Sequence, residues 1–226
     1  MSTLFLVPTP VGNLGDITIR ALEVLKDVSF ILAEDTRVTG KLLKHYEIDT
    51  PMRSYHDHNK EKVTTGHIAT LKGGDSLALV TDAGTPGIAD PAFFIVREAL
   101  KHAIPVVPLP GATAFVPALI GSGLPSDRFI FENFLPPKAS KRKRFFEESK
   151  EQKRTIIFYE SPHRILKVLK EFHEILPTVE IVLAREISKL YEEFLHGTAQ
   201  EILEHYSERK PKGEMVVLFN PQVTRE

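Results

Sequence analysis

The sequence contains no cysteine in its 226 residues. Disulfide bonds, thiolate zinc sites and a cysteine nucleophile are therefore excluded together. No apolar run approaches the ~18 residues that a membrane helix needs, and the start, Met1 to Pro10, has neither the basic nor the apolar region of a signal peptide. These absences predict a soluble, cytoplasmic protein that does not associate with a membrane.

The sequence also lacks an excess of either charge. Its 29 Lys and Arg residues oppose 30 Asp and Glu residues, which leaves a formal net charge of −1. Such a chain has no global attraction for nucleic acid, so an RNA partner would have to be met by local basic patches. A content of 42% hydrophobic and 26% charged residues is typical of a globular protein with one large or two small domains. No internal repeat is evident.

The chain is organised around SLALVTDAGTPGIADP, from Ser76 to Pro91. Leu77 to Val80 has the composition of a buried strand, and Asp82 follows in a polar loop. The Pro86-Gly87 pair predicts a type II turn, because Pro fixes φ at its second position and Gly takes the positive φ at its third. The pattern indicates a strand, a ligand-binding loop and a helix.

Two other apolar segments end in similar loops, Pro8 to Asp16 and Pro108 to Thr113. Three buried strands that each lead through a Pro/Gly loop into a helix place these loops at one end of a parallel sheet. Open α/β folds bind ligands at that end. We therefore expect a cofactor there.

The remaining pattern predicts an α/β fold with two domains, residues 1–115 and 116–226. Strands alternate with helices in the first half, which predicts a parallel sheet, whereas shorter connections in the second half predict a mixed sheet. We expect the cofactor cleft between the two domains. Strands are expected at Leu4–Val7, Ser29–Ala33, Leu77–Val80, Pro105–Pro108, Phe129–Phe134, Arg154–Tyr159, Glu180–Ala184, Glu192–His196 and Met215–Phe219. Helices are expected at Thr18–Lys26, Thr39–Tyr46, Lys60–Leu71, Asp90–His102, Ala112–Ile120, Ser140–Glu151, Pro162–Ile175 and Thr198–Tyr206.

Charged side chains follow several of the predicted strands. Glu34, Asp35 and Arg37 lie at a strand end beside Asn13, where we favour a substrate pocket over a simple ion pair that caps a helix. Glu186 and Lys212 are interpreted in the same way from the second domain. Asp35, Glu186 and Lys212 are candidates for the general base, with Asp35 favoured.

Three polar segments each have two interpretations. His56-Asp57-His58-Asn59 is a metal site or a polar loop that contacts RNA, and the lack of further ligands favours the loop. Lys138 to Arg144 is an exposed helix face or a patch for the RNA backbone. Ser161-Pro162 predicts a helix start, which would place His163 and Arg164 where the helix dipole calls for an anionic partner.

Ten short sequence motifs, taken in their order and spacing, resemble those of the bacterial small-subunit ribosomal RNA cytidine 2′-O-ribose methyltransferases, members of the tetrapyrrole methylase superfamily. The resemblance covers nearly the whole chain. It implies two α/β domains with S-adenosyl-L-methionine in the cleft between them, and a homodimer. The motifs are LVPTPVGNLGDIT, ILAEDTR, HDHN, LVTDAGTPGIADP, VPLPGATA, GLPSDRF, FLPPK, IFYESPHR, LARE and KGEMVV.

The resemblance further implies an activity and its residues. The reaction is 2′-O-methylation of a decoding-centre cytidine in 16S ribosomal RNA, within the 30S subunit; another enzyme adds the methyl group on the base. The residues expected to bind the cofactor are Pro10, Val11, Gly12, Asp82, Ala83, Gly84, Thr85, Ile88, Gly111, Ala112, Thr113, Tyr159, Glu160 and Ala184. Those expected to contact RNA are Asn13, Arg37, His56, His58, Lys138, Lys141, Arg142, Lys143, Arg144, His163 and Arg164.

Chemistry and departures from the family pattern limit the alternatives. A sulfonium methyl group is already activated, so its transfer needs no metal and no covalent nucleophile. Pro8 to Asn13 departs from the GxGPGD pattern of the tetrapyrrole enzymes, which argues against a porphyrinoid substrate. Longer relatives carry a C-terminal extension, so we expect RNA docking to use the two domains and the dimer. A methylase for a tetrapyrrole or a modified histidine, and a non-catalytic binding protein, remain the other candidates.

Overall fold

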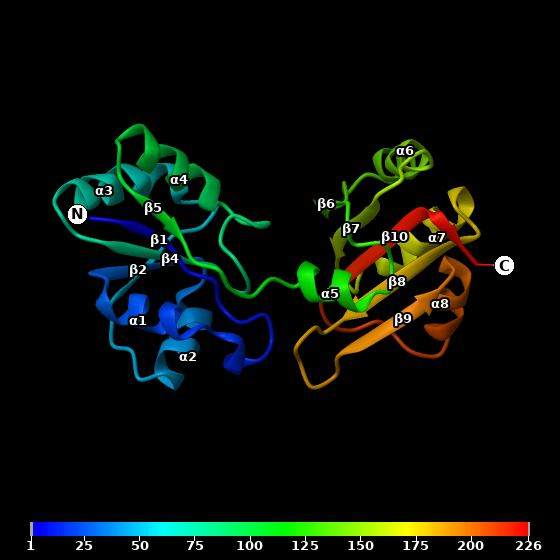
Figure 1. Cartoon of the computed structure of the whole chain (residues 1–226), viewed down its shortest axis with the longest axis horizontal. Helices are drawn as coiled ribbons and strands as arrows, with labels where there is room; N and C mark the ends of the chain where they lie inside the picture. The colour runs from blue at the N-terminus through cyan, green and yellow to red at the C-terminus, as the bar shows by residue number, and fades with distance from the viewer. Residues whose placement is uncertain (1, 226) are drawn as a thin grey trace. The chain divides into compact units, whose positions relative to one another are not determined.

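The computed structural model describes residues 2–225. The chain divides between Thr113 and Ala114 into two compact units, which we call the N-terminal and C-terminal units (Figure 1). The sequence placed this boundary after residue 115. No helix in the described part of the chain is long and apolar enough to cross a membrane.

The N-terminal unit contains a five-stranded parallel sheet in the order β3-β2-β4-β1-β5. Every residue of β4 is buried, because this strand lies between β2 and β1 and both faces of the sheet are covered. That position explains its uninterrupted apolar composition. The strands are β1 (Leu4–Leu6), β2 (Phe30–Ala33), β3 (Met52–Ser54), β4 (Leu77–Val80) and β5 (Val106–Pro108).

Helices cover both faces of this sheet, and each face has its own hydrophobic core. One core packs Ile68 and Ile95 of α3 and α4 against the sheet, and the other packs Leu25 and Leu43 of α1 and α2 (Figure 1). Thr18 begins α1 as the sequence indicated, since its Oγ1 accepts a hydrogen bond from the Ala21 N–H at 3.1 Å. The helices are the short η1 (Leu14–Asp16), α1 (Ile19–Asp27), α2 (Thr36–His45), α3 (Lys60–Lys72) and α4 (Ala92–Lys101).

The C-terminal unit contains a mixed sheet in the order β6-β7-β10-β8-β9. β6 and β7 are parallel, whereas β10 pairs antiparallel with β7 and β8, and β8 pairs antiparallel with β9. The predicted mixed sheet is therefore confirmed. The strands are β6 (Phe129–Phe134), β7 (Thr155–Glu160), β8 (Val179–Arg185), β9 (Glu193–Gly197) and β10 (Met215–Thr224).

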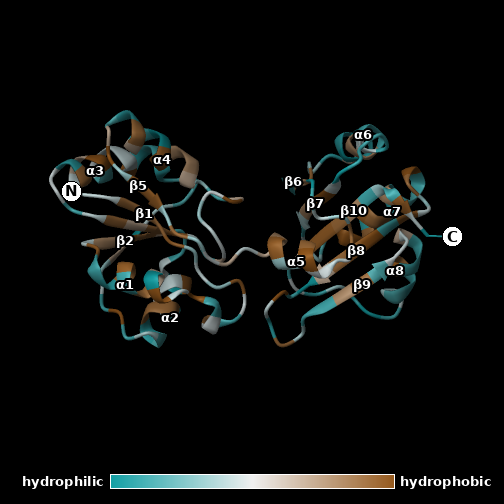
Figure 2. Cartoon of the chain, in the orientation of Figure 1, coloured by the Kyte–Doolittle hydropathy of each residue, from teal (hydrophilic) through white to brown (hydrophobic). Residues whose placement is uncertain are grey.

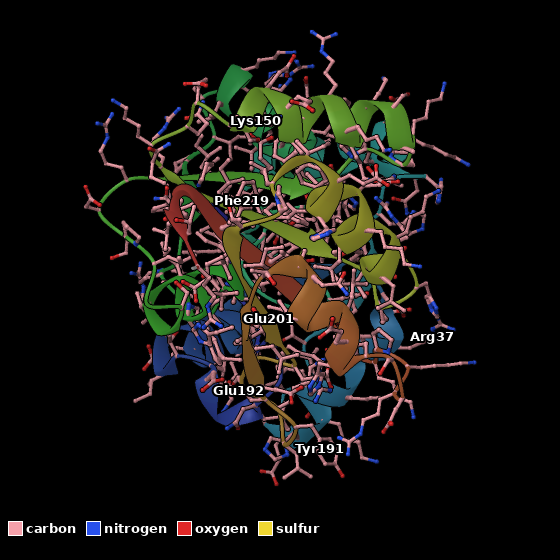
Figure 3. All side chains as sticks on the ribbon, turned by 90° about the vertical axis from the view of Figure 1, so that its right-hand side faces the viewer. Arg37, Lys150, Tyr191, Glu192, Glu201 and Phe219 are labelled. Carbon is pink, nitrogen blue, oxygen red and sulfur yellow. The ribbon has the colours of Figure 1, made fainter. Side chains whose placement is uncertain are left out.

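The core of this unit lies between one face of the sheet and three helices. Alternate residues of β7 and β10, such as Phe158 and Phe219, pack there against Phe146 of α6 and Phe172 of α7. Phe219 lies in the interior of the unit and Tyr191 at the tip of the β8–β9 connection (Figure 3). The central strands are hydrophobic, whereas α6 is largely hydrophilic (Figure 2). The helices are α5 (Phe115–Gly121), α6 (Ala139–Ser149), α7 (Ile165–Ile175) and α8 (Ala199–His205).

Candidate functional site

The first two Pro/Gly loops of the N-terminal unit are joined through their backbones. Thr9 and Gly84 form a two-way bridge, in which each N–H donates to the other residue's carbonyl oxygen at 2.9 Å. The Thr9 hydroxyl donates a second bond to the Thr81 carbonyl oxygen at 3.0 Å. Because β1 and β4 are neighbours in the sheet, their loops leave it side by side and are fixed there.

The third loop joins the other two. The Thr85 hydroxyl donates to the Ala112 carbonyl oxygen at 2.8 Å. A Cβ atom at position 111 would lie 2.5 Å from the Cβ of Pro8, so only glycine allows these two segments to approach so closely. The structure thus confirms that the three loops predicted from sequence meet at the carboxyl end of the parallel sheet.

The Pro86-Gly87 turn has the geometry that the sequence predicted. The Ile88 N–H donates to the Thr85 carbonyl oxygen at 3.2 Å, and Gly87 has a φ of 95°. Asp90 then closes the loop, because its carboxylate accepts from the Gly87 N–H at 2.7 Å and the Ala92 N–H at 2.8 Å. The turn therefore fixes the start of α4 as well as the loop.

Three carboxylates gather beside these loops, at the ends of β2 and β4. Asp82 Oδ1 accepts from the Asp35 N–H at 3.0 Å, and Glu34 Oε2 accepts from the Thr81 hydroxyl at 2.7 Å. Burial, and then the negative charge of Glu34, raises the pKa of Asp82. A cation at this position would relieve both effects.

Asp35, the favoured general base, is engaged in two structural contacts. It caps α2 by accepting from the Arg37 N–H at 2.8 Å, and its carboxylate is paired with the Arg37 guanidinium at 2.6 Å. The hydrogen bonds from Arg37 lower the pKa of Asp35 to about 2. A carboxylate with so low a pKa is a weak proton acceptor, so the interpretation of Asp35 as an ion pair that caps a helix fits the structure better.

S-adenosylmethionine fits this group of residues on chemical grounds. Its sulfonium is a cation, and the carboxylates of Glu34 and Asp82, which form no ion pair among the described residues, lie beside loops held together through their backbones. Gly12 and Gly111 are exposed in these loops and carry no side chain, so their backbones are open to a ligand. The residues that would hold it in this unit are those of the three loops.

Some of the polar residues predicted to contact RNA in this unit form hydrogen bonds with their sequence neighbours. Asn13 Oδ1 accepts from the Gly15 N–H at 3.0 Å and so begins η1. The rings of His56 and His58 lie 5.9 Å apart, and the His56 N–H donates to Asn59 Oδ1. The structure contains no group of three metal-ligating side chains within residues 2–225.

Glu186, the second candidate base, lies in a compact junction of the C-terminal unit. Its Oε1 accepts from Lys189 Nζ at 2.9 Å and from the Glu214 N–H at 3.0 Å, and a Cβ atom at Gly213 would overlap its side chain. Burial alone would raise the pKa of Glu186, but these two hydrogen bonds and the positive charges of Lys189 and Arg185 together outweigh it and lower the pKa. Lys212, the third candidate, is exposed in the same junction.

The cofactor residues predicted in this unit differ in accessibility. Burial raises the pKa of Tyr159 to about 12, and Glu160 is buried with one carboxylate oxygen 3.2 Å from Arg164. Ala184 has no exposed surface, because β8 lies between β10 and β9. The side chain of Ala184 thus lies inside the sheet, and its contact with the cofactor stays a prediction.

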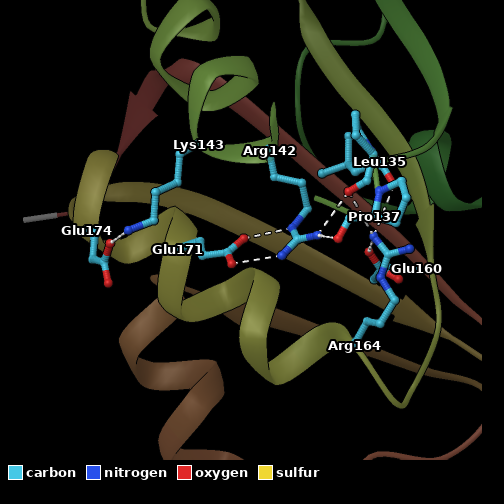
Figure 4. Close-up of polar contacts among 9 residues, drawn as sticks. Leu135, Pro137, Arg142, Lys143, Glu160, Arg164, Glu171 and Glu174 are labelled. Atoms are coloured by element: carbon cyan, nitrogen blue, oxygen red, sulfur yellow. Dashed lines mark hydrogen bonds and ion pairs between the residues drawn. The ribbon is translucent and has the colours of Figure 1, made fainter. Parts of the chain in front are cut away.

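Arg142, which was predicted to contact RNA, lies inside the C-terminal unit. Its side chain is 2% exposed and forms a two-bond pair with Glu171, at 2.7 and 2.8 Å (Figure 4). Its remaining donor reaches the carbonyl oxygens of Pro136 and Pro137. The positive charge of Arg142 is thus neutralised inside the unit by the carboxylate of Glu171.

The other cations of α6 remain exposed but are not equivalent. Lys143 pairs with Glu174, and Arg144 pairs with Glu148. Lys138 and Lys141 have no ion pair among the described residues and are exposed. These two lysines are the part of the predicted basic patch that is best suited to bind phosphate.

The predicted helix start at Ser161-Pro162 is displaced, because α7 begins at Ile165. Ser161 instead closes a turn, in which its hydroxyl oxygen accepts from the His163 N–H and its carbonyl oxygen accepts from the Arg164 N–H. Arg164 has the anionic partner that was expected, since it pairs with the carboxylate of Glu160. His163 is exposed.

Sequence reasoning placed Glu34 at the strand end beside Asn13 and Thr81 in the polar loop after β4, but it missed that these two side chains bond to each other. Glu34 stands directly before Asp35, and Thr81 directly before Asp82. The strand order was not part of the prediction, and it is the pairing of β2 with β4 that places the residues after these strands side by side.

A parallel sheet with glycine loops at its carboxyl edge, joined to a mixed sheet, defines the class of protein. Residues 3–203 match the family model of tetrapyrrole (corrin/porphyrin) methylases, and the chain belongs to this family. It is 48% identical to Ribosomal RNA small subunit methyltransferase I of Synechocystis sp., over 97% of this chain and 79% of that protein. It is 47% identical to the protein of the same name from Bacillus subtilis, over 96% and 75%. The resemblance seen in the motifs is confirmed.

Solved structures show the same fold at low identity. Cobalt precorrin-4 methyltransferase has a TM-score of 0.69 and 16% identity, and covers 96% of this chain and 94% of its own. Uroporphyrin-III C-methyltransferase from Thermus thermophilus has a TM-score of 0.68 and 19% identity, with the same coverage. The predicted tetrapyrrole methylase-like fold is therefore confirmed.

Proposed function

We propose that this protein transfers a methyl group from S-adenosylmethionine to the 2′-hydroxyl of a decoding-centre cytidine in 16S ribosomal RNA. The observation that carries this proposal is the 48% identity over 97% of the chain to a ribosomal RNA small subunit methyltransferase. The three joined loops and the carboxylates beside them support it, because they suit a cationic methyl donor. The assembled 30S subunit as substrate, a homodimer and a cytoplasmic location are parts of the same proposal.

Alignment is the main contribution that we assign to the chain. When bound, S-adenosylmethionine supplies a methyl group that is already activated by its sulfonium. The Thr9–Gly84 bridge and the Thr85–Ala112 bond fix the loops before any ligand arrives. Well-oriented reactants gain roughly 7 to 11 kcal/mol, whereas a general base contributes only about 10²- to 10⁴-fold. Rigid loops are therefore worth more here than any one basic side chain.

The candidates for the general base can be ranked by their surroundings. Asp35 and Glu186 both have lowered pKa values, because each accepts hydrogen bonds from cations and backbone N–H groups. Lys212 has no such contact from its side chain within residues 2–225, but an ammonium must lose its proton before it can accept another. We therefore assign Asp35 and Glu186 positioning roles and keep Lys212 as the candidate that remains.

The family and its solved structures favour one other function, methylation of a tetrapyrrole. The two functions are distinguished by radiolabelled methyl transfer to 30S particles from a strain that lacks the modification, and to a uroporphyrinoid in parallel. Our proposal predicts transfer to the particles alone. Transfer to the tetrapyrrole alone would contradict it, and binding of the donor with no transfer to either would indicate a non-catalytic protein.

A further inference from the structure

Five aromatic rings form one continuous cluster along the β6 edge of the C-terminal sheet. Phe115 stacks on Phe131 with ring centroids 4.7 Å apart, and Phe131 meets Tyr159 edge-on at 5.0 Å. Phe129 and Phe134 extend the cluster, at 6.1 Å from Phe115 and 5.7 Å from Tyr159. We call these five residues the aromatic platform.

A β-bulge places Phe134 on this face. Phe131 pairs with Ile157 and Phe134 pairs with Tyr159, so β6 advances three residues while β7 advances two. The extra residue turns the side chain of Phe134 to the face of Phe129 and Phe131, whereas regular alternation would turn it to the opposite face. Asn133, with a φ of 58°, takes the left-handed conformation within the bulge, which asparagine tolerates better than most residues.

The outer rings of the platform are open to solvent. Phe129 is 43% exposed and Phe134 is 54% exposed, whereas Phe158 and Phe219 of the same sheet are at most 1% exposed. Large apolar groups that are grouped on a surface in this way indicate a binding site.

The segment that carries Phe134 is held in place from inside the unit. Arg164 donates to the Leu135 carbonyl oxygen at 3.0 Å, and Arg142 donates to those of Pro136 and Pro137 at 2.9 and 2.7 Å (Figure 4). Two arginines thus fix the residues that follow the ring. The platform is presented on a rigid support, which lowers the conformational entropy lost on binding.

Cations flank the platform along the chain. Arg128 precedes Phe129, and Lys138 follows Phe134 by four residues; both are exposed and have no ion pair among the described residues. The exposed acidic residues Asp127 and Glu132 stand beside and between these two cations in the sequence. Arg128 and Lys138 therefore do not form a continuous basic surface. Open rings between separate cations suit a single nucleic-acid strand, whose bases stack while its phosphates meet the cations.

We propose that the aromatic platform stacks with one or two unpaired bases of the substrate RNA, with Arg128 and Lys138 at the adjoining phosphates. This inference rests on the proposed function and identifies where the C-terminal unit receives the strand. A second copy of the chain fits the edge less well, because the bulge and Asn133 interrupt the row of backbone groups that strand addition would use.

The test measures binding of the full chain to a short single-stranded oligoribonucleotide by fluorescence anisotropy across a salt series. Stacking is worth about 1 to 3 kcal/mol per base, so Phe134→Ala and Phe129→Ala should each weaken binding roughly 5- to 150-fold. The slope of log affinity against log salt should not change, because no phosphate contact is lost. Phe134→Trp should keep parental affinity, whereas Phe134→Leu, apolar without a ring, should lose it.

Phe93→Ala is the matched control, because Phe93 is 69% exposed on α4 of the other unit and should leave RNA binding unchanged. Equal affinity of Phe134→Leu and the parent would overturn the inference while leaving the proposed function in place. So would a Phe134→Ala variant that loses only self-association, measured by sedimentation. A parent that binds no single-stranded RNA would overturn the inference, whereas the proposed function is tested separately by methyl transfer to 30S particles.

Discussion

At the scale of single residues, the carboxylates at the ends of β2 and β4 divide into two kinds. Asp35 is neutralised by Arg37, and its pKa falls to about 2. Asp82 follows β4 and accepts a hydrogen bond from the Asp35 N–H. It is partly buried near Glu34, and its pKa rises. The favourable place for a cation is therefore Asp82, and the sequence alone does not distinguish it from Asp35.

The first prediction is that Asp82→Asn weakens S-adenosylmethionine binding about tenfold, or ~1.4 kcal/mol, measured by calorimetry. An asparagine oxygen can still accept from the Asp35 N–H, so the loss reports the charge and not the hydrogen bond. The control is Asp75→Asn, because Asp75 lies before β4, at the opposite end of the same strand. Equal affinity of Asp82→Asn and the parent would remove this carboxylate from the donor site.

The second prediction concerns pH. A cationic donor is attracted by the ionised form of Asp82, so its affinity should be full above the pKa of Asp82 and fall as pH drops through that pKa. Because the pKa is raised, this fall should begin at a higher pH than an ordinary aspartate would give. Calorimetry across pH on the parent and Asp82→Asn checks it; a profile of the same shape in the variant would assign the pH dependence to another group.

At the scale of elements, α6 shows how one helix serves two purposes. Its sequence contains four consecutive cations, Lys141 to Arg144, yet the helix turns Arg142 inward to Glu171 of α7. The pair joins α6 to α7 and, through Pro136 and Pro137, to the segment before the helix. An experiment that neutralises all four cations would therefore confuse folding with RNA binding.

The third prediction separates these roles. Arg142→Met should destabilise the protein by about 3 to 5 kcal/mol, because it leaves the Glu171 carboxylate buried without a partner. Adding Glu171→Leu should recover most of the loss. Lys143→Met, which removes an exposed partner of Glu174, should change little. Urea unfolding followed by circular dichroism measures all three, and a double variant as unstable as Arg142→Met would show that packing, not charge, is responsible.

The fourth prediction concerns the exposed lysines. Lys138→Gln with Lys141→Gln should reduce the slope of log RNA affinity against log salt by about 1.4, if each lysine meets one phosphate of a single strand. The donor's affinity should not change. Lys26→Gln with Lys72→Gln, two exposed lysines of the N-terminal unit, is the control pair. An unchanged slope would mean that this end of α6 is only a solvated helix face.

The elements also show what could be predicted from sequence. The three loops could be predicted from their glycine and proline residues. Gly87 adopts a positive φ, and a Cβ atom at Gly111 would overlap Pro8. The start of α7 was misplaced by three residues, since Ser161 caps a turn with the same bonds that would cap a helix. The bulge in β6 and the burial of Arg142 depend on contacts with β7 and α7, which no local pattern encodes.

At the scale of the whole molecule, the chain combines two units whose exposed groups suit different ligands. The N-terminal unit has the three joined loops and the acidic groups that suit a methyl donor. The C-terminal unit has the exposed lysines and aromatic rings that suit an RNA strand. With a net charge of −1, the chain has no general positive field, so we expect any RNA contact to be made by local groups.

The most direct test of the account identifies the methylated nucleoside. The 30S particles from a strain that lacks the modification are treated with the protein and labelled S-adenosylmethionine, and their RNA is digested to nucleosides and separated by mass-resolved chromatography. The account predicts label in a single cytidine of the decoding centre, on the ribose 2′-oxygen. Label on the base, or on no nucleoside of the particle, would contradict it.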